Sequence, residues 1–419
     1  MLAPFEINGK GPIGRTHKPT MTNNIDLLSG SLREPVAQPV ATQFPACPYQ
    51  WQWRGFRICY QQMGDSGPAV LLVHGFGASW RHWRKNVPLL AESCRVFAID
   101  LLGFGGSDKP DPADPGYTFE TWSQQLQAFT QEVIGEPTFL VGNSIGCVVA
   151  LQTAVDAPDL VRGVWMLNCS LRLLHDRRLA TQPWFKRMGA PILQSVLKRR
   201  AIGHWFFRQL ARPKTVKNIL TQAYYKAEAV TDELVDILME PAGDPGAADV
   251  FLAFTGYSQG PLPEDLLQTL SDSPDPCPVA ILWGTEDPWE PVEMGRQFEQ
   301  YACVEKFVAL EDAGHCPQDE APEIVNYWVR DWILWKADQL PGVPEVSTGD
   351  RVIIETQRPD GDPQWNGQKG TVAHVGRRAI TVILDRLDSD NSLVEGERQH
   401  FYREDIRVLA HEESARENP

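Results

Sequence analysis

A serine between two glycines is a candidate for chemistry in this 419-residue sequence. Gly142-Asn143-Ser144-Ile145-Gly146 follows a predicted buried strand at 138–141 and precedes an apolar stretch that predicts a helix. Glycines on both sides suit a nucleophile held on a sharp strand-to-helix turn, because side chains at those positions would collide with the backbone. Ser144 is therefore a candidate nucleophile, and the chemistry would be acyl transfer to water.

An acid and a histidine follow the serine in the order that a catalytic triad on this kind of sheet requires. Asp287 comes soon after a predicted strand at 279–283, and His315 follows another at 305–309. We assign His315 to take the proton of Ser144 and Asp287 to orient its imidazole. Glu286 is the competing carboxylate, and it is less favoured because the acid usually stands directly before the proline of such a loop.

Backbone donors for an oxyanion are predicted at two positions. His74-Gly75-Phe76-Gly77 follows a predicted strand at 69–73, so the N–H of Phe76 can join that of Ile145. Each such donor contributes about 3 kcal/mol to stabilising a tetrahedral intermediate. We interpret His74 as a structural residue that shapes the loop.

The elements that must position these residues alternate between short apolar runs and longer helical stretches from Trp51 to about Gln339, which is typical of a parallel α/β sheet. About a hundred residues separate the strand ending at Leu167 from the acid loop, so a helical cap is predicted at about 171–265. The α/β domain as a whole is expected at 46–340. The candidate strands are 69–73, 95–99, 138–141, 161–167, 279–283 and 305–309.

The two ends of the chain differ from this pattern. Residues 1–45 lack hydrophobic periodicity and predict a disordered arm, in which Met21 is an alternative start. Short alternating runs between Gly and Asp turns at 345–410 predict a small SH3-like β-barrel, which could dock a protein partner. Residues 411–419 are expected to be a polar tail.

The cap has an unusual charge. Residues 171–226 contain 13 Lys or Arg and a single acid, Asp176, with aromatic residues interleaved. The simpler interpretation is that the aromatics pack onto the core and the cations form a solvated face. The alternative hypothesis is that the cap contacts an anionic membrane and admits a long apolar chain toward Ser144. His175 and His204 are expected to serve packing.

Composition excludes several classes of protein. The formal charge of −15 argues against a nucleic-acid binder, and no run approaches the roughly 18 apolar residues of a membrane-spanning helix. The eight cysteines lack metal-ligand spacing, so we expect free thiols in a reducing compartment and no metal or other cofactor. Cys147, Cys169 and Cys316 are expected to be small buried residues near the catalytic loops.

In carrying these motifs, the sequence from about residue 50 to residue 338 resembles the α/β-hydrolase superfamily. Within that superfamily it resembles the pheophytinase and chlorophyll dephytylase-like esterases of plants and cyanobacteria. The resemblance depends on four segments, which are Phe129 to Pro137, Gly142 to Gly146, Glu286 to Trp289, and Gly314 to Glu320 continuing through Val325 to Trp328. It implies an α/β-hydrolase fold with a helical cap and a serine esterase whose catalytic positions are Ser144, Asp287 and His315.

The resemblance further implies a substrate, namely the phytyl ester of a pheophytin or chlorophyll-type pigment. We expect Trp289, Trp205 and Phe206 to bind its apolar chain, and we expect the protein in the cytoplasm, peripheral to the thylakoid membrane. A lipase or general acyl-ester hydrolase is the alternative within the same class. A non-enzymatic assembly protein that uses the C-terminal barrel is the alternative from another class. A haloalkane dehalogenase or epoxide hydrolase is disfavoured, because those enzymes carry a carboxylate at the position of Ser144.

Overall fold

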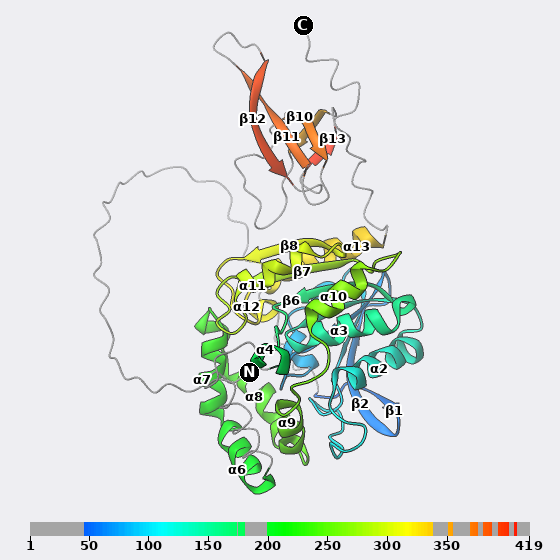
Figure 1. Ribbon diagram of the computed structural model, residues 1–419, viewed down its shortest axis with the longest axis vertical. Helices are drawn as coiled ribbons and strands as arrows, with labels where there is room; N and C mark the ends of the chain where they lie inside the picture. Colours follow the sequence, from blue (N-terminus) through cyan, green and yellow to red (C-terminus); the bar gives the residue numbers. More distant parts are fainter. Residues whose placement is uncertain are drawn as a thin grey trace, which may run out of the picture.

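The computed structural model describes residues 46–173, 175–180, 199–337, 351–354, 369–375, 380–387, 393–401 and 406–408. Its main unit, residues 46–337, is built on an eight-stranded sheet in the order β1-β2-β4-β3-β5-β6-β7-β8 (Figure 1). The strands are β1 (Tyr49–Trp53), β2 (Phe56–Met63), β3 (Ala69–Val73), β4 (Arg95–Ile99), β5 (Thr138–Asn143), β6 (Val161–Leu167), β7 (Val279–Gly284) and β8 (Val304–Leu310).

The six strands that the sequence predicts are all present, within one or two residues at their ends. β3 to β8 are parallel to one another, and every residue of β3, β5 and β7 is buried. Strands buried on both faces appear in sequence as continuous apolar runs, which is why they could be predicted. The antiparallel strands β1 and β2 lie at one edge and were not predicted, because only a few of their side chains are buried and neither strand is a continuous apolar run.

Helices cover both faces of the sheet and divide the core into two clusters. One face packs against α2 (Phe119–Phe129), α3 (Ile145–Asp156) and α10 (Pro263–Ser271). The other face packs against α1 (Val87–Leu90) and α13 (Pro322–Lys336), where Trp165 and Trp332 meet with ring centroids 5.5 Å apart. Buried apolar side chains cover both faces of the sheet, so loops can approach it only at the ends of the strands.

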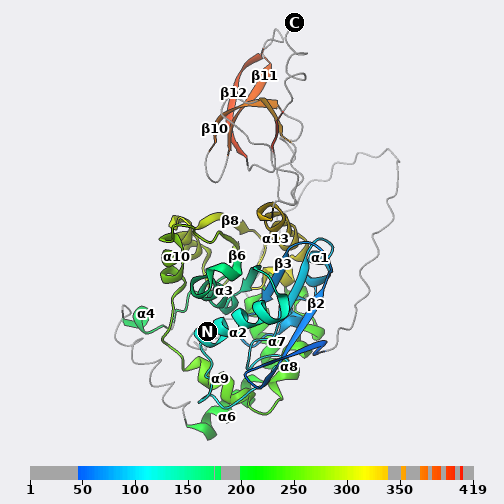
Figure 2. The same ribbon diagram turned by 90° about the vertical axis from the view of Figure 1, so that its right-hand side faces the viewer.

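Between β6 and α10 the chain forms further helices, which lie beyond the carboxyl ends of the strands (Figures 1 and 2). The described ones are α4 (Asp176–Ala180), α6 (Arg200–Leu210), α7 (Pro213–Ala223), α8 (Asp232–Ala242) and α9 (Ala247–Thr255). Leu220, Tyr224 and Leu234 form a small apolar cluster of their own together with Cys316, so these helices pack onto the loop that carries His315.

The remaining described elements form an antiparallel sheet of five strands in the order β12-β11-β10-β9-β13. They are β9 (Arg351–Ile354), β10 (Lys369–Val375), β11 (Ile380–Leu387), β12 (Leu393–Phe401) and β13 (Ile406–Val408). Val352, Ile354 and Val382 are fully buried within it. Closure of this sheet into an SH3-like barrel, and a protein partner for it, stay predictions.

The expected arm at 1–45, the tail at 411–419 and the cap residues 181–198 lie outside the described residues. Within the described part, no helix combines the length and the hydropathy needed to cross a bilayer.

The expectation that all eight cysteines are free thiols is wrong for two of them, because Cys47 and Cys59 form a disulfide. They are 12 residues apart, with Cys47 just before β1 and the buried Cys59 within β2. Sequence spacing could not reveal the pair, since only the β1–β2 hairpin brings the two Cα atoms to 5.2 Å. The other six cysteines are free thiols, as expected, and all six are buried, as predicted for Cys147, Cys169 and Cys316.

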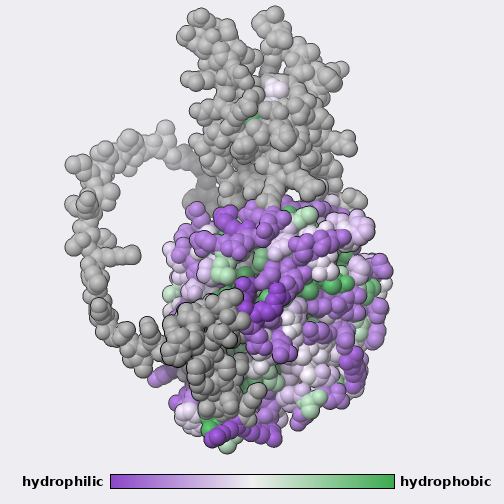
Figure 3. All heavy atoms as spheres, in the orientation of Figure 1, coloured by the Kyte–Doolittle hydropathy of each residue, from purple (hydrophilic) through white to green (hydrophobic). Residues whose placement is uncertain are grey.

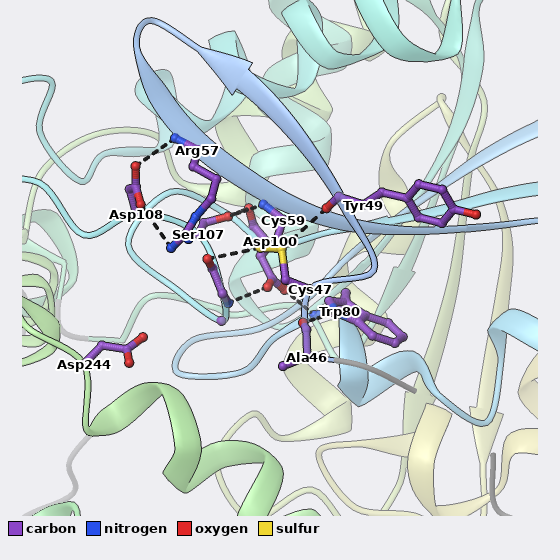
Figure 4. The surroundings of a disulfide bond; sticks show 12 residues. Ala46, Cys47, Tyr49, Arg57, Cys59, Trp80, Asp100, Ser107, Asp108 and Asp244 are labelled. Atoms are coloured by element: carbon purple, nitrogen blue, oxygen red, sulfur yellow. Dashed lines mark hydrogen bonds and ion pairs between the residues drawn. A yellow bond between two sulfur atoms is a disulfide. The ribbon is translucent and has the colours of Figure 1, made fainter. Parts of the chain in front are cut away.

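Figure 4 shows that the disulfide lies beside a hydrogen-bonded junction. Asp100 accepts hydrogen bonds from the N–H of Trp80 at 2.6 Å and of Gly106 at 2.7 Å, and the Trp80 indole donates to the carbonyl of Ala46 at 2.9 Å. Trp80 opens the short helix η1 (Trp80–Trp83), which follows the predicted oxyanion loop. The disulfide therefore links the residues just before β1 to β2, beside the segment around Trp80 that supports the predicted oxyanion loop.

Replacing both cysteines, Cys47→Ser with Cys59→Ser, is expected to lower the stability of the main unit by about 3 kcal/mol. A cross-link closing a loop of this length removes roughly that much conformational free energy from the unfolded chain. Thermal unfolding followed by circular dichroism measures the change. A dithiol reductant should lower the Tm of the unaltered protein and leave that of the double variant unchanged. Equal Tm values for the two proteins under oxidising conditions would contradict the prediction.

Candidate active site

Ser144 occupies a sharp turn between β5 and α3, with φ 55° and ψ −119°. A Cβ at Gly142 would lie 2.5 Å from the backbone of Gly146 and Cys147, and a Cβ at Gly146 would lie 2.3 Å from the carbonyl oxygen of Val73. Only glycine fits at both positions, as the sequence predicts. The Ser144 Oγ is buried and has no hydrogen-bond partner among the described residues.

His315 and Asp287 lie side by side. The imidazole Nδ1 and Asp287 Oδ2 are 2.7 Å apart, and both side chains are buried. Burial alone would lower the pKa of His315, but the charge and the hydrogen bond of Asp287 outweigh it and raise this pKa above 6.5. The Nε2 atom has no partner among the described residues, so it remains available to take a proton.

Asp287 is held ionised by several donors. It accepts from Asn168 Nδ2 at 2.8 Å and from the backbone N–H groups of Trp289 and Glu290 at 2.9 and 3.1 Å. Burial alone would raise the pKa of this carboxyl, but His315 and the hydrogen bonds outweigh it and lower the pKa below its usual value. Glu286 is exposed, and Asp287 is the carboxylate on the imidazole.

The backbone amides of Ile145 and Phe76 stay candidates for binding an oxyanion. Ile145 is the first residue of α3, so its N–H has no acceptor within the helix. The loop that carries Phe76 lies against the nucleophile, since a Cβ on Gly75 would be 3.2 Å from the Cβ of Ser144. His74 fits the structural role expected of it: its Nε2 accepts from the N–H of Leu101 at 3.1 Å, and burial lowers its pKa to about 4.

Asn143 connects the serine turn to the histidine loop and to the end of β6. Its side-chain Nδ2 donates to the carbonyl of His315 at 3.1 Å and to that of Leu167 at 3.2 Å. The N–H of Ser144 also donates to Leu167, at 3.1 Å. Asn143 therefore joins the serine turn directly to the histidine loop. It occupies the first variable position of the G-x-S-x-G motif, where the motif allows any residue.

Sequence reasoning missed two buried polar residues here. Asn168, which follows β6, donates to Asp287 and accepts the N–H of Gly284 at 3.0 Å. Glu290 is 4% exposed, and burial raises its pKa to about 7. Asn168 could have been noticed, since it lies at the carboxyl end of a predicted strand like the other site residues. Nothing in the sequence around Glu290 signals its burial.

The three residues expected to bind an apolar chain differ in position. The ring centroid of Trp289 lies 5.0 Å from that of His315. Phe206 is half-buried on α6, with its ring centroid 6.5 Å from that of Phe251. Trp205 is 57% exposed, whereas Ser144, Asp287 and His315 are buried.

A line of aromatic rings, which we call the aromatic row, leads away from the predicted oxyanion loop. Phe76 lies 5.1 Å from Phe254 and 5.7 Å from Phe251, and Phe251 lies 5.3 Å from Phe207 of α6, all between ring centroids. The α9 residues Phe251 to Thr255 are only partly buried although the helix is strongly apolar. The row thus forms a continuous series of ring contacts from α6 to the loop beside Ser144.

The remaining candidates are accounted for by local contacts. Burial raises the pKa of the Cys169 and Cys316 thiols well above 9, consistent with inert side chains. His175 contacts the carbonyl of Gly260 at 3.0 Å, and His204 contacts Asp249 at 2.7 Å. Among the described residues no group of His, Cys, Asp and Glu side chains is arranged to hold a metal ion.

A parallel sheet with a serine turn, an acid loop and a histidine loop at the carboxyl ends of its strands defines an α/β hydrolase. Residues 70–326 match the family described as "Alpha/beta hydrolase family". The chain therefore belongs to the alpha/beta hydrolase family.

Known proteins agree with this assignment. Pheophytinase of the Arabidopsis thaliana chloroplast is 30% identical over 320 residues, and the match covers 67% of this chain and 65% of that protein. Epoxide hydrolase 3 of Xenopus tropicalis is 26% identical, covering 67% and 75%. A crystal structure of a DBJA mutant superimposes with a TM-score of 0.54 at 20% identity, covering 69% and 99%, and supports the fold.

Asp287→Asn is expected to lower the pKa of His315, because it removes the carboxylate charge that favours the imidazolium. The imidazole of the unaltered protein should lose its proton at a higher pH than an ordinary histidine does. The imidazole of the variant should lose it at a lower pH than that of the unaltered protein. Titration of the imidazole by NMR measures both values. Glu286→Gln is the matched control and should leave the titration unchanged. A larger effect of Glu286→Gln than of Asp287→Asn would contradict the arrangement.

Proposed function

We propose that this protein is a serine esterase that hydrolyses the carboxylic ester of a long apolar alcohol. The observation that carries the proposal is the hydrogen-bonded pair of Asp287 and His315 beside the turn that holds Ser144. Neither the Ser144 Oγ nor the His315 Nε2 has a hydrogen-bond partner among the described residues, so the hydrogen bond between them that proton transfer requires would form when substrate binds.

The proposed reaction has two stages. Ser144 Oγ attacks the ester carbonyl while His315 Nε2 accepts its proton, and the N–H groups of Phe76 and Ile145 stabilise the oxyanion. His315 then returns the proton to the leaving alcohol, and the acyl group remains on Ser144. Water, activated by His315, attacks this acyl-enzyme and releases the carboxylic acid. Asp287 stays ionised throughout and stabilises the imidazolium.

The substrate that we propose is the phytyl ester of a pheophytin or chlorophyll-type pigment. Support comes from the similarity to pheophytinase and from the aromatic row, whose apolar rings suit a long hydrocarbon chain. Epoxide hydrolases are also similar, but the serine at position 144 favours ester hydrolysis over chemistry that needs a carboxylate nucleophile. A lipase acting on glycerolipids uses the same triad, and the assay below separates the two.

Ser144→Ala is expected to reduce ester hydrolysis about 10⁴- to 10⁶-fold, because it removes the nucleophile. Purified protein is incubated in detergent with pheophytin, chlorophyll and a triglyceride, and the products are separated by chromatography. Ser123→Ala, at a buried serine of α2, is the control and should retain activity. Release of phytol is the expected result. Fatty acid without phytol would identify a lipase, and product formation by Ser144→Ala would refute the assignment.

Phe251→Ala is expected to lower kcat/KM for a long-chain ester about tenfold and to leave that for an acetyl ester unchanged. The ring lies in the aromatic row, so only a long chain would lose contact with it. Steady-state kinetics with both esters measure the ratio. Phe307→Ala on β8, where the ring stacks on Trp283, is a control of equal size. Equal losses on both esters would contradict a chain-binding role.

A further inference from the structure

The outer face of α6 and the start of α7 has an uneven distribution of charge. From Arg199 to Lys226 the chain contains seven Lys or Arg and no Asp or Glu. Arg208, Arg212 and Lys214 are exposed and form no ion pair with any described residue. We call the surface formed by Ile202, Trp205, Arg208, Arg212 and Lys214 the α6–α7 face.

Other cations of this segment are neutralised by the helices next to it. Arg200 pairs with Asp249 of α9 at 3.1 Å, and Lys217 pairs with Asp232 of α8 at 2.7 Å. The positive charge of residues 171–226 is therefore partly offset, because acids of α8 and α9 pair with some of its cations. The positive charge that remains is concentrated where α6 ends and α7 begins.

Apolar side chains lie beside these cations. Trp205 is 57% exposed and Ile202 is 37% exposed. Trp205 is three residues from both Ile202 and Arg208, so the three share one side of the helix. Figure 3 shows hydrophobic residues next to hydrophilic ones at the lower end of the molecule, where α6 lies. Exposing a tryptophan ring to water is unfavourable, so an exposed tryptophan beside arginines indicates a surface that binds a partner.

The α6–α7 face is connected to the candidate active site. In both ribbon views α6 lies at the end of the main unit opposite α13. On its inner side Phe207 contacts Phe251, and Phe251 contacts Phe76 of the predicted oxyanion loop. The aromatic row therefore begins directly behind the exposed face.

We propose that the α6–α7 face binds the surface of an anionic lipid bilayer. Arginine and lysine are attracted to negatively charged headgroups, and tryptophan prefers the boundary between headgroups and acyl chains. This inference rests on the proposed function, since a long-chain ester dissolved in the bilayer would then enter along the aromatic row. The net charge of −15 makes nucleic acid an unfavourable partner for the same face.

Sedimentation with vesicles tests the inference. The full chain is expected to bind vesicles that contain phosphatidylglycerol, to bind pure phosphatidylcholine weakly, and to dissociate when salt rises from 0.1 M to 1 M. That change shortens the screening length from about 10 Å to about 3 Å. Arg208→Gln with Arg212→Gln should weaken binding about 25-fold, since each cation near such a surface is worth about fivefold. Trp205→Ala should weaken binding at both salt concentrations.

The matched control is Arg54→Gln with Arg162→Gln, which removes the same charge from exposed positions on other elements and should bind normally. Equal losses in the two double variants, or binding that ignores salt, would overturn the inference. Equally tight, variant-sensitive binding to a DNA duplex would also overturn it in favour of a general polyanion site. Hydrolysis of a soluble short-chain ester is measured in parallel. Vesicle binding without any hydrolysis would refute the proposed function alone, and hydrolysis without vesicle binding would refute the docking alone.

Discussion

The close approach of α3 to β3 is the constraint on which the site depends. Gly146 lies against the Val73 carbonyl, and Gly142 lies against the backbone of Gly146, so the turn between them has no room for a Cβ. Ser144 is thereby held at a positive φ, a conformation that costs a non-glycine residue of order 1–3 kcal/mol. The packing of the buried strands and of α3 offsets this conformational cost. It also holds the backbone of Ser144 in a fixed position next to the neighbouring loops.

Parallel strands extend this constraint to the rest of the site. Because β3, β5, β6, β7 and β8 run in the same direction, the loops after them meet at one edge of the sheet. Hydrogen bonds then connect these loops to one another, through Asn143 to His315 and through Asn168 to Asp287. The cap contributes as well, since the N–H of His315 donates to the carbonyl of Ala223 at 2.9 Å. The position of the histidine therefore depends on both the sheet and the end of α7.

Much of this arrangement could be predicted because it is local in sequence. Short apolar runs located β3 to β8, and the glycines around Ser144 marked the turn. Asp287 could be preferred over Glu286, and the structure puts its carboxylate on the imidazole. The role of Asn168 and the burial of Glu290 could not be predicted, because each depends on contacts between residues far apart in the chain. The edge strands β1 and β2 were missed because they lack a continuous apolar run. The charge of the cap belongs with these, since the acids that offset Arg200 and Lys217 lie on later helices.

The sequence by itself determined the order of the strands along the chain, the turn at Ser144 and the residues offered for acid, base and oxyanion. These follow from side-chain size, hydropathy and backbone freedom, which are properties of short segments. Only the tertiary structure decided the Cys47–Cys59 disulfide, the partners that hold Asp287 ionised, and the row of rings from α6 to Phe76. Each of these features is a contact between separate segments of the chain. Such contacts form only when burial of apolar surface brings those segments together.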